Sequence, residues 1–340
     1  MVARVLLWGL AAQLLLDRSA ALAHVRTITH FSVDGRQVDA IVPACASATS
    51  PIVLSLHAWG SSKADQRATD RLPTYMGAEC PVLIYPQGKI RGALFGAVGW
   101  SWNAGGCCPN GNSDHLDDVG FLQRVISYAA SHFHISADLV FVVGLSNGGM
   151  MANRLACTDD RIKAFVAVSG PLINGTAGSD LTETFECHRS VPVLHFHGLA
   201  DESIPFDGCN TTFGGVACES VEKLLGGKMA AMPRVLDYIA DWRLRNGVSE
   251  APARPTFENN TCSCQSWGEA TNNVTLCTLK DEGHAWPGSC RLSNMLPMFR
   301  CSMDIDASQQ AMDFFRRYIP TTAGILVSQT FGRKRASRIR

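Results

Sequence analysis

The stretch from residue 139 to residue 150 reads LVFVVGLSNGGM, and it constrains the fold more than any other part of this sequence. Its first five residues are apolar without a break, which is typical of a strand buried on both faces. Ser146 follows between glycines, and NGGMMANRLAC then carries a helical pattern. So sharp a turn needs small neighbours, here Gly144 and Gly148, for the two elements to pass closely. The stretch therefore predicts a strand, a tight turn at Ser146 and a helix.

Apolar runs and helical patterns alternate through most of the chain. The expected strands are LVFVVGLS, IKAFVAVSGP and VPVLHFHGLAD, and three more stretches are each expected to be a strand that ends in a loop: PIVLSLHAWG, CPVLIYPQG and NVTLCTLKDEGHAWPG. The stretch FSVDGRQVDAIVP is expected to form a hairpin at Asp34-Gly35. The expected helices cover 116–133, 147–157, 229–246 and 306–318. This alternation predicts an α/β domain with a mostly parallel sheet and helices on both faces. Residues 88–115 and 203–228 interrupt the pattern and are candidate walls of a binding site.

Ser146 is a candidate nucleophile, because a helix begins beneath its hydroxyl and favours negative charge there. A serine hydroxyl needs a histidine base, and the histidine needs a carboxylate to orient it. In a large class of α/β enzymes these groups follow the order serine, acid, histidine. The run VPVLHFHG leads to Asp201, and NVTLCTLKDEG leads to His284, so both arise after expected strands in that order. We expect Ser146, Asp201 and His284 to form a catalytic triad.

Several other side chains compete for these roles. His195 and His197 lie inside an expected strand, which favours a structural or supporting role, and His57 precedes the serine, which is the wrong order for the base. Glu202 and Asp207 are the rivals of Asp201, which is preferred because it lies directly at the strand exit. Asp281 and Glu282 lie too close to His284 in sequence to orient it easily.

Acyl transfer also requires backbone N–H groups that bind the oxyanion. The N–H of Asn147, directly after the candidate nucleophile, is one expected donor. The loop after the first buried strand reads His57-Ala58-Trp59-Gly60 and is expected to supply the second donor, from Ala58 or Trp59.

The composition limits the partners and the compartment. Thirty basic residues balance thirty acidic ones in 340 residues, so no overall charge draws the protein to nucleic acid or acidic lipid. Residues 1–23 combine Arg4, the apolar run VLLWGLAAQLLL and the small-residue site Ala21-Leu22-Ala23. This pattern predicts a secretory signal peptide, and no later stretch is long enough for a membrane helix.

Thirteen cysteines favour an oxidising compartment, so we expect an extracellular protein. Their odd number leaves at least one thiol unpaired or paired with another chain, and short loops suit pairs Cys209–Cys218 and Cys290–Cys301. Glycosylation sequons occur at Asn174, Asn210, Asn259 and Asn273. We expect one catalytic domain over 24–320 and a basic tail over 321–340.

Six motifs resemble one family of enzymes. They are LHAWGSS at 56–62, WNAGGCC at 102–108, DDVGF at 117–121, GLSNGGMMANRLAC at 144–157, HGLADESIPF at 197–206 and EGHAWPG at 282–288. In this order they resemble the secreted esterases of the polyhydroxybutyrate-depolymerase type, which are related to the feruloyl and acetylxylan esterases of carbohydrate esterase family one.

The resemblance implies an α/β-hydrolase fold without metal or organic cofactor, and the triad Ser146, Asp201 and His284. It also implies that Trp102, Asn103 and Cys107 or Cys108 border the substrate pocket, and that Cys157 pairs with Cys107 or Cys108. Four tryptophans lie in or beside the loops at the strand ends and are able either to stack on a substrate ring or to pack the loops: Trp59, Trp100, Trp102 and Trp286. We include Trp286 among the expected substrate-binding residues.

Three functions remain open from the sequence. The first is a secreted carboxylesterase that acts on feruloyl or acetyl esters of plant cell-wall polysaccharide. The second is depolymerisation of polyhydroxybutyrate by the same chemistry, which a missing linker and polymer-binding domain disfavour. The third is a non-catalytic binding protein on the same fold.

Overall fold

The computed structural model describes residues 25–94, 97–107, 116–173, 185–209, 232–291 and 299–320. Within these ranges, none of the helices has the length and apolar character needed to span a bilayer. The expected signal peptide and the expected basic tail lie outside the described residues. So do Cys108, Cys218, Asn174 and Asn210.

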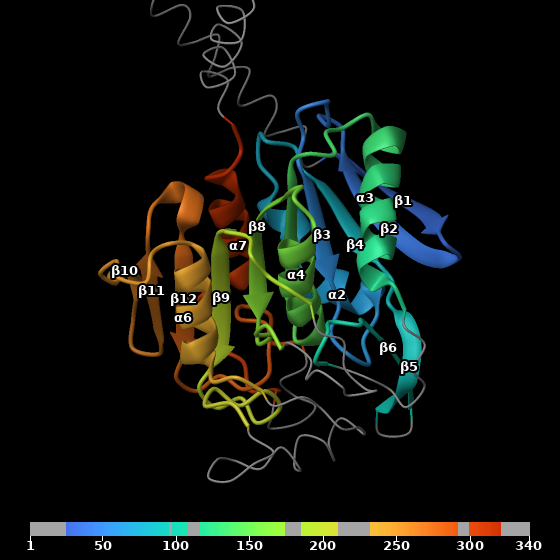
Figure 1. Cartoon of the computed structure of the whole chain (residues 1–340). Helices are drawn as coiled ribbons and strands as arrows, with labels where there is room; N and C mark the ends of the chain where they lie inside the picture. Colours follow the sequence, from blue (N-terminus) through green and yellow to red (C-terminus); the bar gives the residue numbers. More distant parts are fainter. Residues whose placement is uncertain are drawn as a thin grey trace, which may run out of the picture.

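A ten-stranded sheet forms the centre of the molecule, in the order β1-β2-β4-β3-β7-β8-β9-β12-β11-β10 (Figure 1). Its strands are β1 (Arg26–Val33), β2 (Arg36–Pro43), β3 (Ile52–Leu56), β4 (Val82–Pro86), β7 (Val140–Leu145), β8 (Ile162–Val168), β9 (Val193–Gly198), β10 (Arg254–Glu258), β11 (Cys262–Trp267) and β12 (Val274–Leu279). All neighbours from β4 to β12 are parallel, and the remaining pairs at both edges are antiparallel. The carboxyl ends of the central strands therefore meet at one edge, where a site can be assembled from several loops.

Helices cover both faces of this sheet, as the sequence predicted. They are α2 (Lys63–Asp70), α3 (Asp118–Phe133), α4 (Asn147–Thr158), α6 (Val235–Arg245) and α7 (Ala307–Arg316), with short 3-10 turns at Leu72–Tyr75 and Ala270–Asn272. Helices α3, α4 and α6 cover one face of the sheet and α7 covers the other (Figure 1). The apolar side chains of the first three helices belong to one core and those of α7 to the other. The two faces have separate apolar cores.

Strand β7 shows why the central strands read as unbroken apolar runs. Val140 and Val142 point into the core beneath α3, α4 and α6, whereas Phe141, Val143 and Leu145 point into the core beneath α7. Successive side chains of a strand alternate between faces, so a strand covered on both sides must be apolar at every position.

The helix expected over 229–246 is shorter than predicted. It begins at Val235, because the backbone N–H and C=O of Met232 are both bonded to Cys209. Pro233 follows, and a residue before proline is disfavoured in the α conformation. A helical turn at Met232 is thus replaced by a bridge between two loop segments.

Four strands were absent from the sequence-based prediction. Strands β5 (Lys89–Leu94) and β6 (Ala97–Ser101) form a separate two-stranded sheet inside the segment that was expected to be a loop. Strands β10 and β11 extend the main sheet beyond β12. The exposed and intermediate positions along β10 leave it without the apolar pattern that marks a buried strand.

Four disulfides join described cysteines: Cys45–Cys80, Cys157–Cys187, Cys264–Cys277 and Cys290–Cys301. The expected pair Cys290–Cys301 is confirmed. Cys262 is a free, buried thiol, in line with the odd cysteine count. Cys107 and Cys209 are also disulfide-bonded.

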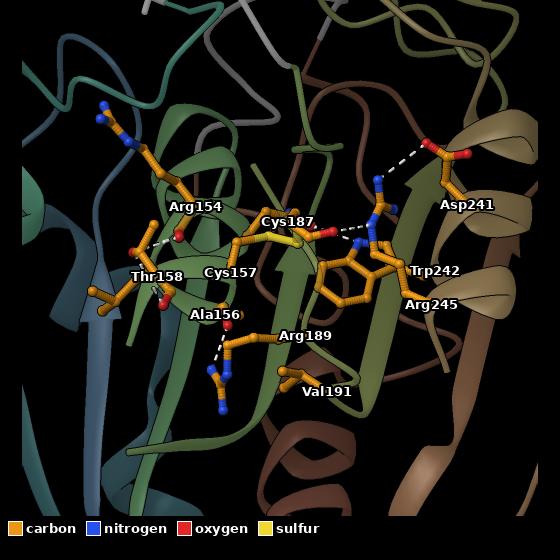
Figure 2. Close-up of a disulfide and its surroundings, with 12 residues drawn as sticks. Arg154, Ala156, Cys157, Thr158, Cys187, Arg189, Val191, Asp241, Trp242 and Arg245 are labelled. Carbon is orange, nitrogen blue, oxygen red and sulfur yellow. Dashed lines mark hydrogen bonds and ion pairs between the residues drawn. A yellow bond between two sulfur atoms is a disulfide. The ribbon is translucent and has the colours of Figure 1, made fainter. Parts of the chain in front are cut away.

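The expected pairing of Cys157 with Cys107 or Cys108 is wrong, because Cys157 is bonded to Cys187 (Figure 2). Cys157 lies at the far end of α4, ten residues beyond Asn147, which is about 15 Å along a helix axis. The segment before β9 passes that end of the helix, and Arg245 of α6 donates to the carbonyl of Cys187 there. The disulfide thus fastens the approach to β9 onto α4.

The two described glycosylation sequons differ in accessibility. Asn259 is exposed in a turn after β10. Asn273 is buried, and its side-chain amide donates to Ser266 while its side-chain oxygen accepts from Thr275. A glycan on the folded chain fits only the first of these two positions.

Candidate functional site

Ser146 lies in the tight turn between β7 and α4, with φ of 55° and ψ of −123°. A serine rarely adopts positive φ, so the turn is strained and is held by its surroundings. A Cβ on Gly148 would lie 2.2 Å from the carbonyl oxygen of Leu56, and a Cβ on Gly144 would lie 2.3 Å from the carbonyl carbon of Gly148. Glycine is therefore required at both positions. The predicted turn and its need for small neighbours are confirmed.

Asp201 and His284 meet at the same edge of the sheet. Asp201 follows β9 and His284 follows β12, which is the parallel neighbour of β9. The Nδ1–H of His284 donates to Oδ2 of Asp201 at 2.8 Å. A carboxylate on Nδ1 leaves the Nε2 of His284 free of the proton, as a general base requires.

The loop that carries Asp201 is held by the same carboxylate. Oδ1 accepts the backbone N–H groups of Ser203 at 2.9 Å and of Ile204 at 2.8 Å. Burial raises the pKa of the Asp201 carboxyl, but the neighbouring His284 and the other donors outweigh it and lower that pKa below its ordinary value. Asp201 is therefore an ionised carboxylate at neutral pH.

The rival carboxylates lie elsewhere. Glu202 and Asp207 are exposed, and Asp207 faces Arg234. Glu282 is buried, and its Oε2 accepts the N–H of Ser302 rather than any group of His284. Of these carboxylates, Asp201 alone forms a hydrogen bond with His284 among the described residues.

The loop after β3 lies beside the turn of Ser146, and the side chain of His57 shapes this loop. His57 is completely buried, and burial lowers its pKa to about 4, so the imidazole is neutral. Its Nδ1–H donates to the carbonyl of Ala58 at 2.8 Å, while Nε2 accepts the N–H of Gly88 at 2.9 Å. A carbonyl and the next N–H point in opposite directions across a trans peptide. His57 therefore turns the N–H of Trp59 away from itself.

Three backbone N–H groups near this turn form no hydrogen bond with the described residues. Among the hydrogen bonds of the described residues, none uses the N–H of Asn147, Ala58 or Trp59. In contrast, the N–H of Ser146 is bonded to Val168. Ala58 does not have the positive φ that would strain a non-glycine residue.

Trp102 was expected to border the substrate, and this role stays a prediction. Its side chain is completely buried, and its indole N–H donates to the carbonyl of His57 at 3.0 Å. Its backbone forms two hydrogen bonds with the side chain of Asn147, at 2.7 and 3.0 Å. Trp102 thus joins the loop after β3 to the start of α4. Asn103 is half-buried and donates its amide to the carbonyl of Leu116.

Trp286 is also buried, and its expected role in substrate binding stays a prediction. Its indole N–H donates to Ser308 of α7 at 2.9 Å, which anchors the loop that carries His284. Trp59 is nearly buried as well. Of the four tryptophans singled out from the sequence, Trp100 alone keeps a partly accessible side chain.

Trp100 lines a surface hollow of about 440 Å³ at the carboxyl edge of the sheet. The turn between β1 and β2, the end of β4 and the start of α3 form the other walls. Polar side chains in these walls include Gln37, Gln87 and Asp117. The carbonyl of Trp100 accepts the N–H of Gly60, so the hollow adjoins the loop after β3.

Sequence reasoning missed Asn153, which holds α4 in place through four hydrogen bonds. Its amide N–H₂ donates to the carbonyls of Gly149 and Gly170, and its oxygen accepts from Tyr238 and Trp242 of α6. A polar residue in the middle of a helix that is otherwise buried was the available signal, because such a group must find partners.

Comparison with known proteins finds esterases. The chain is 24% identical over 250 residues to a bifunctional acetylxylan esterase/xylanase of Neocallimastix patriciarum, which covers 73% of this chain and 30% of the relative. It is 27% identical over 244 residues to NocK of Nocardia uniformis subsp. tsuyamanensis, whose name describes an esterase, with 70% of this chain and 66% of the relative covered. It is 30% identical over 128 residues to feruloyl esterase B of Neurospora crassa, with 36% of this chain and 40% of the relative covered. The chain thus spans at most about two thirds of the length of these relatives.

Solved structures show the fold. An acetyl xylan esterase from Aspergillus awamori superimposes with a TM-score of 0.53 at 14% identity and covers 80% of this chain and 98% of its own. This chain has the α/β-hydrolase fold. The expected fold is thereby confirmed. No protein-family model matches the sequence.

In this chain the sharp turn follows β7, and the end of β3 lies beside it. The expected role of the loop after β3 in binding an oxyanion stays a prediction. The relatives agree with the expected similarity to acetylxylan and feruloyl esterases. The narrower similarity to polyhydroxybutyrate depolymerases stays a prediction.

Proposed function

We propose that the protein is an extracellular serine carboxylesterase that hydrolyses acetyl or feruloyl esters of plant cell-wall polysaccharide. The observation that carries this proposal is the bond of 2.8 Å between His284 and Asp201, at the same sheet edge as the strained turn of Ser146. The esterase relatives and the shared fold support the reaction class.

In the proposed reaction the Oγ of Ser146 attacks the ester carbonyl carbon, and its proton passes to Nε2 of His284. The tetrahedral intermediate then collapses, and the leaving sugar oxygen takes that proton. Water attacks the resulting acyl-enzyme with His284 again as base, which releases the carboxylic acid and restores Ser146. Asp201 stays ionised throughout and stabilises the imidazolium that forms twice in each cycle.

The oxyanion is assigned to the N–H groups of Asn147 and Trp59. Both are without an acceptor among the described hydrogen bonds, and the bond from His57 to the Ala58 carbonyl orients the second of them. The N–H of Ala58 is the alternative second donor. Preorganised donors of this kind typically contribute roughly 10²–10³ in rate each.

Polysaccharide esters are preferred as substrates because of the hollow beside Trp100. A half-buried tryptophan with amide, carboxylate and basic side chains around it suits a sugar ring, which offers an apolar face and a rim of hydroxyl groups. Acetylxylan and feruloyl esterases are also the named activities of relatives. An extracellular location is supported by four disulfides, since such bonds persist in oxidising compartments.

The test is ester hydrolysis by the purified protein beside the Ser146→Ala variant. Methyl ferulate, acetylated xylan and a polyhydroxybutyrate suspension are offered in parallel, together with a small activated acetate. We expect serine-dependent release of ferulate or acetate. Release from polyhydroxybutyrate alone would favour the depolymerase, and absence of serine-dependent hydrolysis with every ester would favour a binding protein.

A further inference from the structure

Two histidines of β9 lie side by side beneath the loop of Asp201. His195 and His197 are separated by two positions, so their side chains point to the same face of the sheet. Both are buried, and the ring of His195 also packs edge-on against Tyr238 of α6. Neither imidazole touches solvent, and neither takes part in the proposed reaction.

The hydrogen bonds of this pair determine where each proton lies. Nε2 of His197 is 2.8 Å from the carbonyl of Ile204, and a carbonyl only accepts, so this nitrogen carries the proton. Burial lowers the pKa of both histidines, which keeps them neutral. Nδ1 of His197 is therefore a lone pair, and it lies 3.0 Å from Nε2 of His195. That second nitrogen must be the donor.

The remaining nitrogen of His195 completes the assignment. If Nε2 carries the proton, Nδ1 of this neutral imidazole is an acceptor. Nδ1 is buried and has no hydrogen-bond partner among the described residues. Leaving a buried acceptor unpaired costs free energy. The folded protein thus loses free energy at His195, which an apolar side chain packed at the same position would not cause.

The histidine pair holds the loop that carries Asp201. The N–H of Ile204 donates to Oδ1 of Asp201 at 2.8 Å, and its carbonyl accepts from His197. Ile204 is therefore bound on both sides, by the carboxylate and by the histidine. Nε2 of His197 also lies 3.7 Å from Oδ2 of Asp201, the oxygen that binds His284.

We propose that His197 is a positioning residue for Asp201, and that His195 holds His197 in the tautomer that this role requires. The donor on His197 fixes the carbonyl of Ile204, and thereby the loop that aims Oδ2 at His284. This inference rests on the proposed function, because the aim of Asp201 matters only where His284 is the base.

The tautomers are tested without any activity, by ¹⁵N NMR of the protein labelled at histidine. Resonances of the two residues are identified by their loss in His195→Gln and His197→Gln. We expect both imidazoles to be neutral and protonated at Nε2, with Nδ1 unprotonated, through the pH range in which the protein stays folded. A protonated Nδ1 or a cationic ring on His197 would overturn the assignment.

The positioning role is tested with matched substitutions at His197. Gln retains an N–H₂ group near the place of Nε2, whereas Leu has a comparable size and no donor. We expect His197→Leu to lower kcat on a small activated acetate roughly 10–100-fold with little change in KM, and His197→Gln to recover most of it. The downfield proton resonance of the His284 Nδ1–H should weaken or move in the Leu variant and return in the Gln variant.

Thermal unfolding of each variant separates positioning from loss of fold. Equal kcat for the Leu and Gln variants, per folded molecule, would overturn the role of the donor. If Ser146→Ala kept full activity, the proposed function would fail while the ¹⁵N assignment still held, so the two failures are distinguishable.

Discussion

His284 donates its Nδ1–H to Oδ2 of Asp201 at 2.8 Å, across a sequence separation of 83 residues. We expect Asp201→Asn to lower kcat roughly 10³–10⁴-fold, because an amide in place of Oδ2 favours the wrong tautomer of His284. The measurement is the steady-state rate on a soluble ester. The exposed neighbour Glu202 provides the control, and Glu202→Gln should leave kcat within about twofold. Equal losses in the two variants would contradict the assignment of the acid.

The close passage of α4 over β3 should not tolerate a side chain at Gly148. Its Cβ would lie 2.2 Å from the Leu56 carbonyl oxygen, and backbone cannot move away as a side chain can. We expect Gly148→Ala to lose about 1–3 kcal/mol of stability, together with most of the activity, since the turn of Ser146 must shift. Denaturant unfolding and ester hydrolysis check both effects.

Gly247 is the matched control for that substitution. It has φ of +68° but no atom within 4 Å of an added Cβ, so Gly247→Ala introduces backbone strain without a clash. We expect a loss of about 1 kcal/mol and normal activity. If the Gly148 variant were as active as the Gly247 variant, the turn of Ser146 would be less tightly packed than the Cβ distances at Gly148 indicate.

The hollow beside Trp100 should matter for polymeric substrates. We expect Trp100→Ala to raise KM for acetylated xylan about tenfold, which corresponds to about 1.4 kcal/mol of lost binding. Hydrolysis of a small activated acetate should change less than about twofold, because that ester does not reach the hollow. A parallel loss on both substrates would indicate that the indole supports the loop after β3 and does not bind a sugar ring.

Glu282 should make stability depend on pH. Burial raises the pKa of this carboxyl from 4.5 to about 8 in the folded protein. The unfolded chain therefore releases this proton first, and stability falls as the pH rises from about 4.5 towards about 8. Glu282→Gln, which keeps an acceptor for the Ser302 N–H, should remove this part of the decline. Unfolding free energies at pH 5 and pH 8 provide the comparison, and identical pH slopes would exclude a buried neutral Glu282.

The disulfide Cys290–Cys301 closes a short loop directly after His284. That loop is bonded back to residues just before the histidine, through Arg300 to Gly283 and through Ser302 to Glu282. Replacing both cysteines by Ser should cost about 3 kcal/mol of stability and lower kcat as His284 loses its support.

The cross-strand disulfide Cys264–Cys277 is the control, because its sequence separation of 13 is close to the 11 of Cys290–Cys301. Its double Ser variant should lose comparable stability with little change in kcat per folded molecule. If removal of Cys264–Cys277 reduced kcat equally, the effect of Cys290–Cys301 would be one of general stability.

Features that depend on neighbours in sequence were predictable. The apolar run of β7, the glycines around Ser146 and the order of Ser146, Asp201 and His284 follow from local patterns. A strand buried on both faces must be apolar throughout, and a turn this tight must exclude Cβ atoms. These requirements act within a few residues, so they are visible in one sequence.

Features that depend on contacts between distant segments were decided only by the tertiary structure. Composition cannot tell a tryptophan that packs a loop from one that faces a ligand, and the packing buries Trp102 and Trp286 while it leaves Trp100 partly accessible. The length of α4 gives Cys157 a partner at Cys187 that spacing did not indicate. The proton positions of His195 and His197 follow from acceptors that only folding brings within reach. Burial and hydrogen bonding are properties of the whole chain, and for that reason the sequence named the candidate reacting groups but not the contacts that hold them in place.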